Sequence, residues 1–227
     1  MTRYIKLSVR NLVELILRSG DIDSTFMSSL RAVEGTKAHQ KVQNSYGGEY
    51  RAEVFLRYTL DYEGFVIEIE GRVDGIIEED GKVIIDEIKS TLRPLEEIHE
   101  DYNILHWAQA KCYGYMYLKE KGLEEIELQL TYFNIESENI KRFIRRYTIG
   151  ELEEFFLSLI EKYLEWANLT FYWIKVRDEA IKELSFPFKS YRKGQRKLAI
   201  SVYRTILDGK KIFIHAPTSI GNTISTL

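Results

Sequence analysis

The sequence predicts an α/β protein in which helices flank a central β-sheet. Strand-favouring runs, rich in apolar and β-branched residues, occur at 50–60, 64–70, 71–89, 125–134 and 139–148. Apolar residues at helical spacing occur between and beyond these runs, at 9–19, 104–121 and 150–167. Each helical stripe is expected to pack against the sheet, which makes these residues candidates for the core.

The composition is that of an ordinary soluble globular domain. The chain has 227 residues, of which 44% are hydrophobic and 30% are charged. No apolar run approaches the ~18 residues that span a bilayer, and the first residues lack the apolar core of a signal peptide. We therefore expect a cytoplasmic protein without a membrane partner.

The net charge of −3 is not typical of a nucleic-acid-binding domain, which is usually basic. A metal site built from carboxylates is compatible with an acidic protein, but contacts to DNA would then need local basic patches. The basic residues at 141–146 are one candidate patch, with Arg142 and Arg145 as the predicted DNA contacts. A solvated strand face explains the same pattern equally well.

The segment Gly71–Lys89 predicts a β-hairpin whose turn contains the Asp80-Gly81 dipeptide. Asp74 lies in the first strand, and the second strand carries the run from Asp86 to Lys89. Side chains alternate along a strand, so Glu87 and Lys89 share one face while Asp86 lies on the other. Two carboxylates and an ammonium group brought together in this way can hold a divalent metal beside a water or a phosphate.

A solvated surface is the ordinary explanation for such a short charged motif. The second strand, however, is apolar on both faces, because Val83, Ile84, Ile85 and Ile88 surround the charges. Such a pattern is typical of a central strand, where buried charges need partners or a metal. Asp86 is the rival to Glu87 as a metal ligand, and strand alternation favours Glu87 because it shares a face with Lys89.

The pattern G-x-x-D, a turn, and then E-x-K resembles the PD-(D/E)xK nuclease superfamily, in particular its RecB-like exonuclease branch. The resemblance implies a restriction-endonuclease-like core with a mixed sheet, and it assigns catalytic roles to Asp74, Glu87 and Lys89. This branch also has a G-x-x-x-H helix before the metal strands, which Gly35–His39 matches within a helix predicted over 24–42. The resemblance thus implies that His39, Asp74, Glu87 and the backbone carbonyl of Ile88 bind the metal.

A Q-x-x-x-Y helix follows the E-x-K strand in the same branch, and Gln109–Tyr113 matches it. In isolation, a tyrosine on a buried helix usually packs and a glutamine usually faces solvent. The resemblance implies instead that Gln109 and Tyr113 help to hold DNA and the active site. These motifs occur here in the same order as in the family.

The resemblance therefore implies a DNA exonuclease that depends on Mg²⁺ or Mn²⁺, acts on single-stranded ends and serves DNA repair or recombination. Lys89 would orient the attacking water, help to deprotonate it, or stabilise developing charge. Cys112 is the only cysteine, so the four-cysteine iron–sulfur cluster of some relatives is not expected. The alternative is a catalytically silent module that binds DNA or another protein.

The last part of the chain, 185–227, resembles the opening of a DinG/XPD-type superfamily 2 DNA helicase. The similar segments are Tyr191–Gln195, Ile212–His215 and Ala216–Thr223. Ser219 and Asn222 replace the glycine and the lysine of that family's phosphate loop. We therefore predict a nuclease domain at 1–184 followed by a truncated helicase segment without ATPase or helicase activity.

Overall fold

The computed structural model describes residues 3–19, 29–79, 81–185 and 188–215, and the side chains of 29–33 are not described. Two features expected from the sequence lie outside the described residues. One is the start of the second predicted helix at 23–24, and the other is the phosphate-loop-like segment 216–223.

Six strands form one sheet in the described part of the chain. They are β1 (Arg3–Ser8), β2 (Tyr50–Tyr62), β3 (Phe65–Glu79), β4 (Lys82–Thr91), β5 (Glu125–Asn134) and β6 (Ile140–Thr148). The order is β1-β3-β4-β5-β6, with β2 also paired to β3. The β1–β3 and β4–β5 pairs are parallel and the others are antiparallel, which confirms the α/β class with a mixed central sheet.

The predicted hairpin forms between β3 and β4, and Gly81 in its turn has a φ of 76°, which glycine adopts without strain. Its first arm is longer than the sequence indicated. The predicted strands at 64–70 and from Gly71 onward are one continuous strand of 15 residues, β3.

Two strands, β1 and β4, share one edge of β3. This arrangement, here called the fork, positions the pocket of the candidate active site. Strand β3 pairs with β1 over Phe65–Glu70 and with β4 over Gly75–Glu79, so residues 71–74 have no partner in either ladder. On the other edge, the register with β2 omits Asp74, and the opposing Glu53 has a φ of 54°. Left-handed backbone at a residue other than glycine is uncommon and often marks a functional site.

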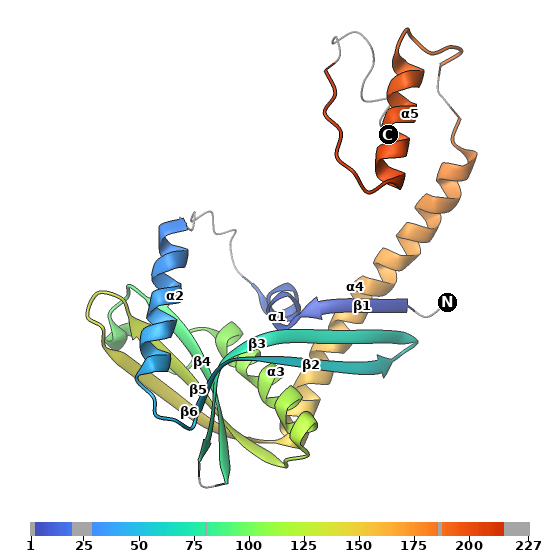
Figure 1. Ribbon diagram of the computed structural model, residues 1–227. Helices are drawn as coiled ribbons and strands as arrows, with labels where there is room; N and C mark the ends of the chain where they lie inside the picture. The colour runs from blue at the N-terminus through green and yellow to red at the C-terminus, as the bar shows by residue number, and fades with distance from the viewer. Residues whose placement is uncertain (1–2, 20–28, 80, 186–187, 216–227) are drawn as a thin grey trace. The chain divides into compact units, whose positions relative to one another are not determined.

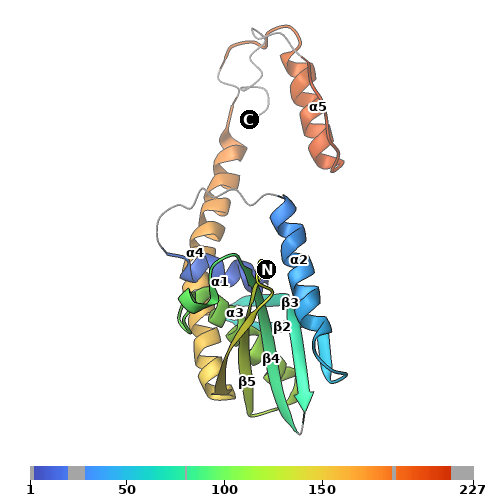
Figure 2. The same cartoon turned by 90° about the vertical axis from the view of Figure 1, so that its left-hand side faces the viewer.

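Helices cover both faces of the sheet (Figures 1 and 2). Helix α2 (Ser29–Asn44) covers one face, where Ala38 and Val42 pack against Ile88 and Phe133. Helices α1 (Val9–Leu17), α3 (Ile104–Lys121) and the first part of α4 (Ile149–Glu183) lie on the other face. A short 3₁₀ helix, η1 (Leu95–Glu97), lies in the connection before α3.

Local signals explain the helix ends. The Ser8 hydroxyl caps α1 by accepting a hydrogen bond from the Asn11 amide, and the Asn103 side chain caps α3 in the same way through Leu105. Gly122 ends α3 in the left-handed conformation. Helix α4 continues well beyond the predicted 150–167, because the apolar stripe identifies only its packed part, whose last buried residue is Ala167.

The chain divides into two compact units, residues 1–170 and 171–227. The second contains helix α5 (Gln195–Leu207), in which the buried Gln195 side chain accepts a hydrogen bond from the Arg192 amide at 2.7 Å. None of the described helices is long and apolar enough to cross a membrane. The domain boundary at 184 and the helicase resemblance stay predictions.

Gly114, in the middle of α3, allows this helix to approach the sheet closely. A Cβ there would lie 2.8 Å from Leu128 Cδ2 and 3.1 Å from Leu152 Cδ1, whereas a Cβ at Gly150 meets nothing within 4 Å. We expect Gly114→Val to lower the free energy of unfolding by ~1–3 kcal/mol through overpacking. Urea denaturation measures this, with Gly150→Val as the matched control; equal stability of the two variants would contradict it.

Candidate active site

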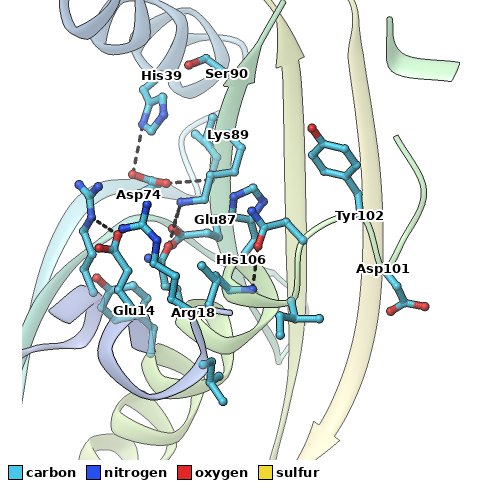
Figure 3. A pocket seen from close by; sticks show the side chains of 18 of the residues that line it. Glu14, Arg18, His39, Asp74, Glu87, Lys89, Ser90, Asp101, Tyr102 and His106 are labelled. Atoms are coloured by element: carbon cyan, nitrogen blue, oxygen red, sulfur yellow. Dashed lines mark hydrogen bonds and ion pairs between the residues drawn. The ribbon is translucent and has the colours of Figure 1, made fainter. Parts of the chain in front are cut away.

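A pocket of about 970 Å³ opens where β3 forks (Figure 3). Its walls come from α1, α2, β3, β4, the connection before α3, and α3 itself. The pocket brings together seven of the nine predicted site residues, which are His39, Asp74, Glu87, Ile88, Lys89, Gln109 and Tyr113. Residues far apart in the sequence therefore meet where the sheet ladder is interrupted.

Asp74 connects the two branches of the fork. Its Oδ2 accepts a hydrogen bond of 2.7 Å from the backbone amide of Ile88, and its Oδ1 lies 3.2 Å from His39 Nδ1. Its backbone carbonyl accepts a hydrogen bond of 3.0 Å from Gln43 Nε2. Hydrogen bonds and an ion pair from other segments thus hold Asp74 at the point where its strand has no partner in the sheet ladders.

Glu87 is almost completely buried, at 5% exposure, and its two oxygens differ. Its Oε1 accepts a 2.5 Å hydrogen bond from Lys89 Nζ, which also donates to Gln109 Oε1 at 3.0 Å. Among the described residues, no group forms a hydrogen bond with the buried Oε2. Burial raises the pKa of Glu87, Lys89 lowers it and Asp74 raises it, with a net result of about 7.

His39 approaches the same site from α2. Burial lowers its pKa. The hydrogen bond to Asp74 and the negative charge of that carboxylate together raise the pKa by more than burial lowers it, so the net shift is upward. Gly35, one turn earlier on the same helix, faces Ser90 of β4, because a Cβ there would lie 3.5 Å from Ser90 Oγ. This is ordinary van der Waals contact between α2 and the sheet.

Asp86 lies on the opposite face of β4, within the core and outside the pocket lining. It is fully buried, and Oδ1 accepts hydrogen bonds from Thr131 Oγ1 at 2.5 Å and from Gln129 Nε2 at 3.0 Å. Oδ2 accepts from the Tyr50 hydroxyl at 3.3 Å. Both of its oxygens have protein partners, which supports Glu87 over Asp86 as the metal ligand.

Tyr113 packs directly against β3 and accounts for the glycine of the G-x-x-D motif. A Cβ on Gly71 would lie 2.7 Å from the Tyr113 hydroxyl oxygen. Burial, with added effects of the Glu87 and Asp74 charges, raises the pKa of Tyr113, which therefore stays protonated. Gln109, one turn earlier, is also buried and holds Lys89.

The two predicted DNA contacts on β6 are not part of the pocket lining. Arg142 donates a hydrogen bond of 3.1 Å to the Tyr46 hydroxyl. Arg145 forms ion pairs with Glu100 at 2.6 Å and Asp101 at 2.8 Å, and its guanidinium lies 4.6 Å from the ring centroid of Trp107. A DNA-binding role for these arginines stays a prediction.

Three other arginines line the pocket and were not expected from the sequence: Arg10, Arg18 and Arg72. Arg10 forms an ion pair with Glu14 at 2.7 Å, and Figure 3 shows Glu14 and Arg18 beside the pocket at α1. The sequence indicated α1 as a packing helix from its apolar stripe. The two arginines near the ends of this helix, Arg10 and Arg18, were visible in the sequence. Whether their side chains point into the pocket depends on how α1 packs on α3.

The arrangement fits a divalent cation, although no ready-made group of three or more His, Cys, Asp or Glu ligands occurs in the described part of the chain. The buried Oε2 of Glu87 is an acceptor for which the described part of the chain supplies no donor. Such an atom is costly to bury unless something binds it. Carboxylate oxygens suit Mg²⁺ and Mn²⁺, and an imidazole such as that of His39 is an accepted additional ligand.

A mixed sheet that carries two carboxylates and a lysine on adjoining strands defines a restriction-endonuclease-like core. The sequence model of the PD-(D/E)XK nuclease superfamily matches residues 9–196. The chain belongs to this superfamily, whose members generally use divalent metal ions.

Several solved structures are similar to this chain at low identity. The structure titled SSO0001 is 20% identical with a TM-score of 0.46, and the comparison covers 69% of this chain and 75% of that one. An alkaline exonuclease from Laribacter hongkongensis is 13% identical with a TM-score of 0.39, covering 75% and 94% of the two chains. Its complex with dAMP has a TM-score of 0.34 at the same identity and coverage. No curated protein sequence matches this chain.

The raised pKa of Glu87 predicts a pH-dependent stability in metal-free buffer. Between pH ~4.5 and ~7 the folded protein retains a proton that the unfolded chain releases, so the free energy of unfolding falls as the pH rises. We expect a slope approaching ~1.4 kcal/mol per pH unit in the wild type, reduced in Glu87→Gln. Urea titrations in EDTA at several pH values measure the difference, and parallel curves would contradict the prediction.

Asp86 is expected to contribute to the free energy of unfolding and not to metal binding. Asp86→Ala leaves the Thr131 hydroxyl and the Gln129 amide without their buried acceptor, so we expect a loss of ~1–3 kcal/mol at neutral pH. Thermal and urea denaturation of Asp86→Ala, compared with the wild type and with Glu87→Gln, measure this loss. A stable Asp86→Ala protein would show that the network on this face contributes little.

Proposed function

We propose that the protein is a metal-dependent deoxyribonuclease that hydrolyses phosphodiester bonds as an exonuclease. One observation carries the proposal. In a protein of this superfamily, Glu87 holds a buried carboxylate oxygen that has no partner among the residues that the structure describes, in the pocket that Asp74 and Lys89 also line. A carboxylate in such a state is suited to bind a cation and, through it, a phosphate.

Asp74 and Glu87 would hold Mg²⁺ or Mn²⁺, with His39 and the Ile88 carbonyl as further ligands. When bound, the metal lowers the pKa of a coordinated water and stabilises negative charge on the phosphate and the leaving oxygen. The hydrogen bond from the Ile88 amide to Asp74 keeps that carboxylate at the fork. His39 would donate its hydrogen bond to Asp74 only while no cation occupies the site.

Lys89 would orient the attacking water or stabilise the charge that develops on the phosphate. Gln109 accepts one of its hydrogen bonds at 3.0 Å, which restricts the ammonium group to the Glu87 side of the pocket. A donor fixed in advance stabilises a transition state without a cost of reorganisation. Gln109 therefore acts as a positioning residue, and Tyr113 supports the strand that carries Asp74.

The substrate we propose is DNA, with single-stranded ends favoured, in a cytoplasmic repair or recombination process. Arg18 and Arg72 line the pocket and supply positive charge that attracts a phosphate, whereas Arg10 is paired with Glu14 in the same lining. The lining as a whole carries four carboxylates and four arginine or lysine side chains, so this attraction is local to the two arginines. Arg142 and Arg145 remain candidates for contacts further along the strand.

The second candidate function is a catalytically silent module that binds DNA. The ion pair of 2.5 Å between Lys89 and Glu87 favours it, because that contact occupies one of the oxygens a metal would need. The two functions differ in one measurable property. Calorimetric binding of Mn²⁺ without cleavage of any DNA would indicate the silent module.

For residues 185–227 we propose a segment derived from a superfamily 2 helicase. The buried Gln195, held by the Arg192 amide, supports the resemblance at Tyr191–Gln195. Asn222 offers no charge to a β- or γ-phosphate, so this segment is expected to lack ATPase and helicase activity. Hydrolysis of ATP by the purified chain would overturn this.

The nuclease proposal predicts metal-dependent loss of end-labelled single-stranded DNA with Mn²⁺ or Mg²⁺ and none with EDTA. We expect Glu87→Gln to reduce the rate by about 10²-fold or more, because it removes the charge of a metal ligand. Glu79→Gln, exposed at the end of the neighbouring strand β3, is the matched control and should retain the wild-type rate.

Gel analysis of 5′- and 3′-labelled strands measures both the rate and the direction of degradation. Absence of cleavage by the wild type with every metal would exclude the enzyme. Equal rates in the wild type and Glu87→Gln would show that Glu87 is not a ligand.

A further inference from the structure

We propose that Tyr102 is a stacking platform for a nucleobase of single-stranded DNA, and that Arg145 positions it. This inference rests on the proposed function, because it requires DNA as the ligand of the pocket. It assigns the two walls of the pocket to different parts of a nucleotide. The arginine wall takes the phosphate backbone and the Tyr102 wall takes the base.

Tyr102 lines the pocket and keeps 39% of its surface exposed, although it lies among buried aromatic residues. Figure 3 shows it on a different side of the pocket from Glu14 and Arg18. The neighbouring Ile104 also lines the pocket and is 57% exposed. This wall therefore presents an aromatic ring and an aliphatic side chain to a site whose other groups are mostly charged.

The Tyr102 ring is held in place by contacts with neighbouring side chains, of which Tyr132 is buried. Tyr102 contacts the Tyr132 ring edge-to-face, with centroids 6.1 Å apart and planes at 85°. Tyr132 is 1% exposed, and its hydroxyl forms a 2.8 Å hydrogen bond with His106 Nδ1. The Arg93 guanidinium lies 5.8 Å from the Tyr102 ring centroid. A ring fixed in this way loses little entropy when a base stacks on it.

The backbone that carries Tyr102 is tied to β6 and α3. Lys141 Nζ donates to the carbonyls of Leu95 at 2.9 Å and Ile98 at 2.8 Å. Arg145 binds the side chains of Glu100 and Asp101, which directly precede Tyr102. Two basic residues of β6, Lys141 and Arg145, therefore fasten this connection, and Arg145 acts on DNA through Tyr102.

The charges assign the two walls. Asp101 lines the Tyr102 side with a side chain that is 79% exposed, and it shares the Arg145 guanidinium with Glu100, so a phosphate is disfavoured there. Arg18 and Arg72 lie elsewhere in the lining and attract one, whereas Arg10 is paired with Glu14. A base can reach Tyr102 only when it is unstacked from its neighbours, which is the condition of a single strand or a frayed end.

The test is binding of fluorescent single-stranded DNA in EDTA, measured by anisotropy, so that cleavage plays no part. Two oligonucleotides are compared, one with all its bases and one with abasic sites at the terminal positions. We expect Tyr102→Ala to weaken binding of the first by about 5- to 150-fold, the effect of losing one stacked base. Tyr102→Phe, which keeps the ring, and Tyr4→Ala, an exposed tyrosine on β1, should bind like the wild type.

The abasic oligonucleotide makes the result specific. It should bind the wild type as weakly as the complete strand binds Tyr102→Ala, and the two losses should not add, because they remove the same contact. Wild-type affinity in Tyr102→Ala, or additive losses, would overturn the proposal while leaving DNA as the substrate. Failure of the wild type to bind either strand would overturn this proposal together with DNA as the ligand.

A salt titration separates the role of Arg145 from a direct phosphate contact. If Arg145 positions Tyr102, Arg145→Ala weakens binding, leaves the slope of log K against log salt unchanged, and adds nothing to Tyr102→Ala. If it binds a phosphate, the slope falls in magnitude by about 0.7 and the losses add, which would overturn the positioning role. Normal far-UV circular dichroism of each variant confirms that it is folded.

Discussion

The site depends on the hydrogen bond from the Ile88 amide to Asp74 Oδ2, at 2.7 Å. Where β3 leaves β1 and has not yet joined β4, the strands offer no backbone partner, and the Asp74 carboxylate accepts the β4 amide instead. Buried amides are almost always bonded, so Asp74 completes the sheet at the fork while it lines the pocket. The same residue therefore serves the fold and the proposed chemistry, and Glu53, opposite it on β2, has left-handed backbone.

Strand β4 separates two kinds of buried carboxylate that are adjacent in sequence. Asp86 faces α2 and has protein donors for both oxygens, whereas Glu87 faces α3 and has one oxygen to which no described residue donates. The first arrangement stabilises the folded chain, and the second leaves binding capacity for a ligand at a cost to stability. The face on which a carboxylate lies thus decides which of these roles it has.

Much of the fold and the centre of the site could be predicted from sequence. The apolar pattern predicted the same bounds for α3 and β5 that the structure shows. The alternation of side chains along β4 placed Glu87 and Asp86 on opposite faces. The fork in β3 could not be predicted, because it depends on β1 and β4 sharing one edge of a strand that is continuous in sequence. Arg18 was missed, since the packing of α1 decides whether its side chain enters the pocket. Arg145 was predicted to contact DNA because it is basic. Its ion pairs with the loop at 100–101 could not be predicted, because that loop lies far from it in the sequence.

The fork also has a consequence for how the complete chain refolds. The β3–β4 hairpin closes over a short turn, whereas β1 must pair with β3 across the whole segment between Ser8 and Phe65. Asp74 and Glu87 can therefore meet before the wall that carries Arg10 and Arg18 is anchored beside them. When the full chain refolds, the cation-binding half of the pocket is expected to assemble first, and the amino-terminal strand and helix complete the half that recognises phosphate.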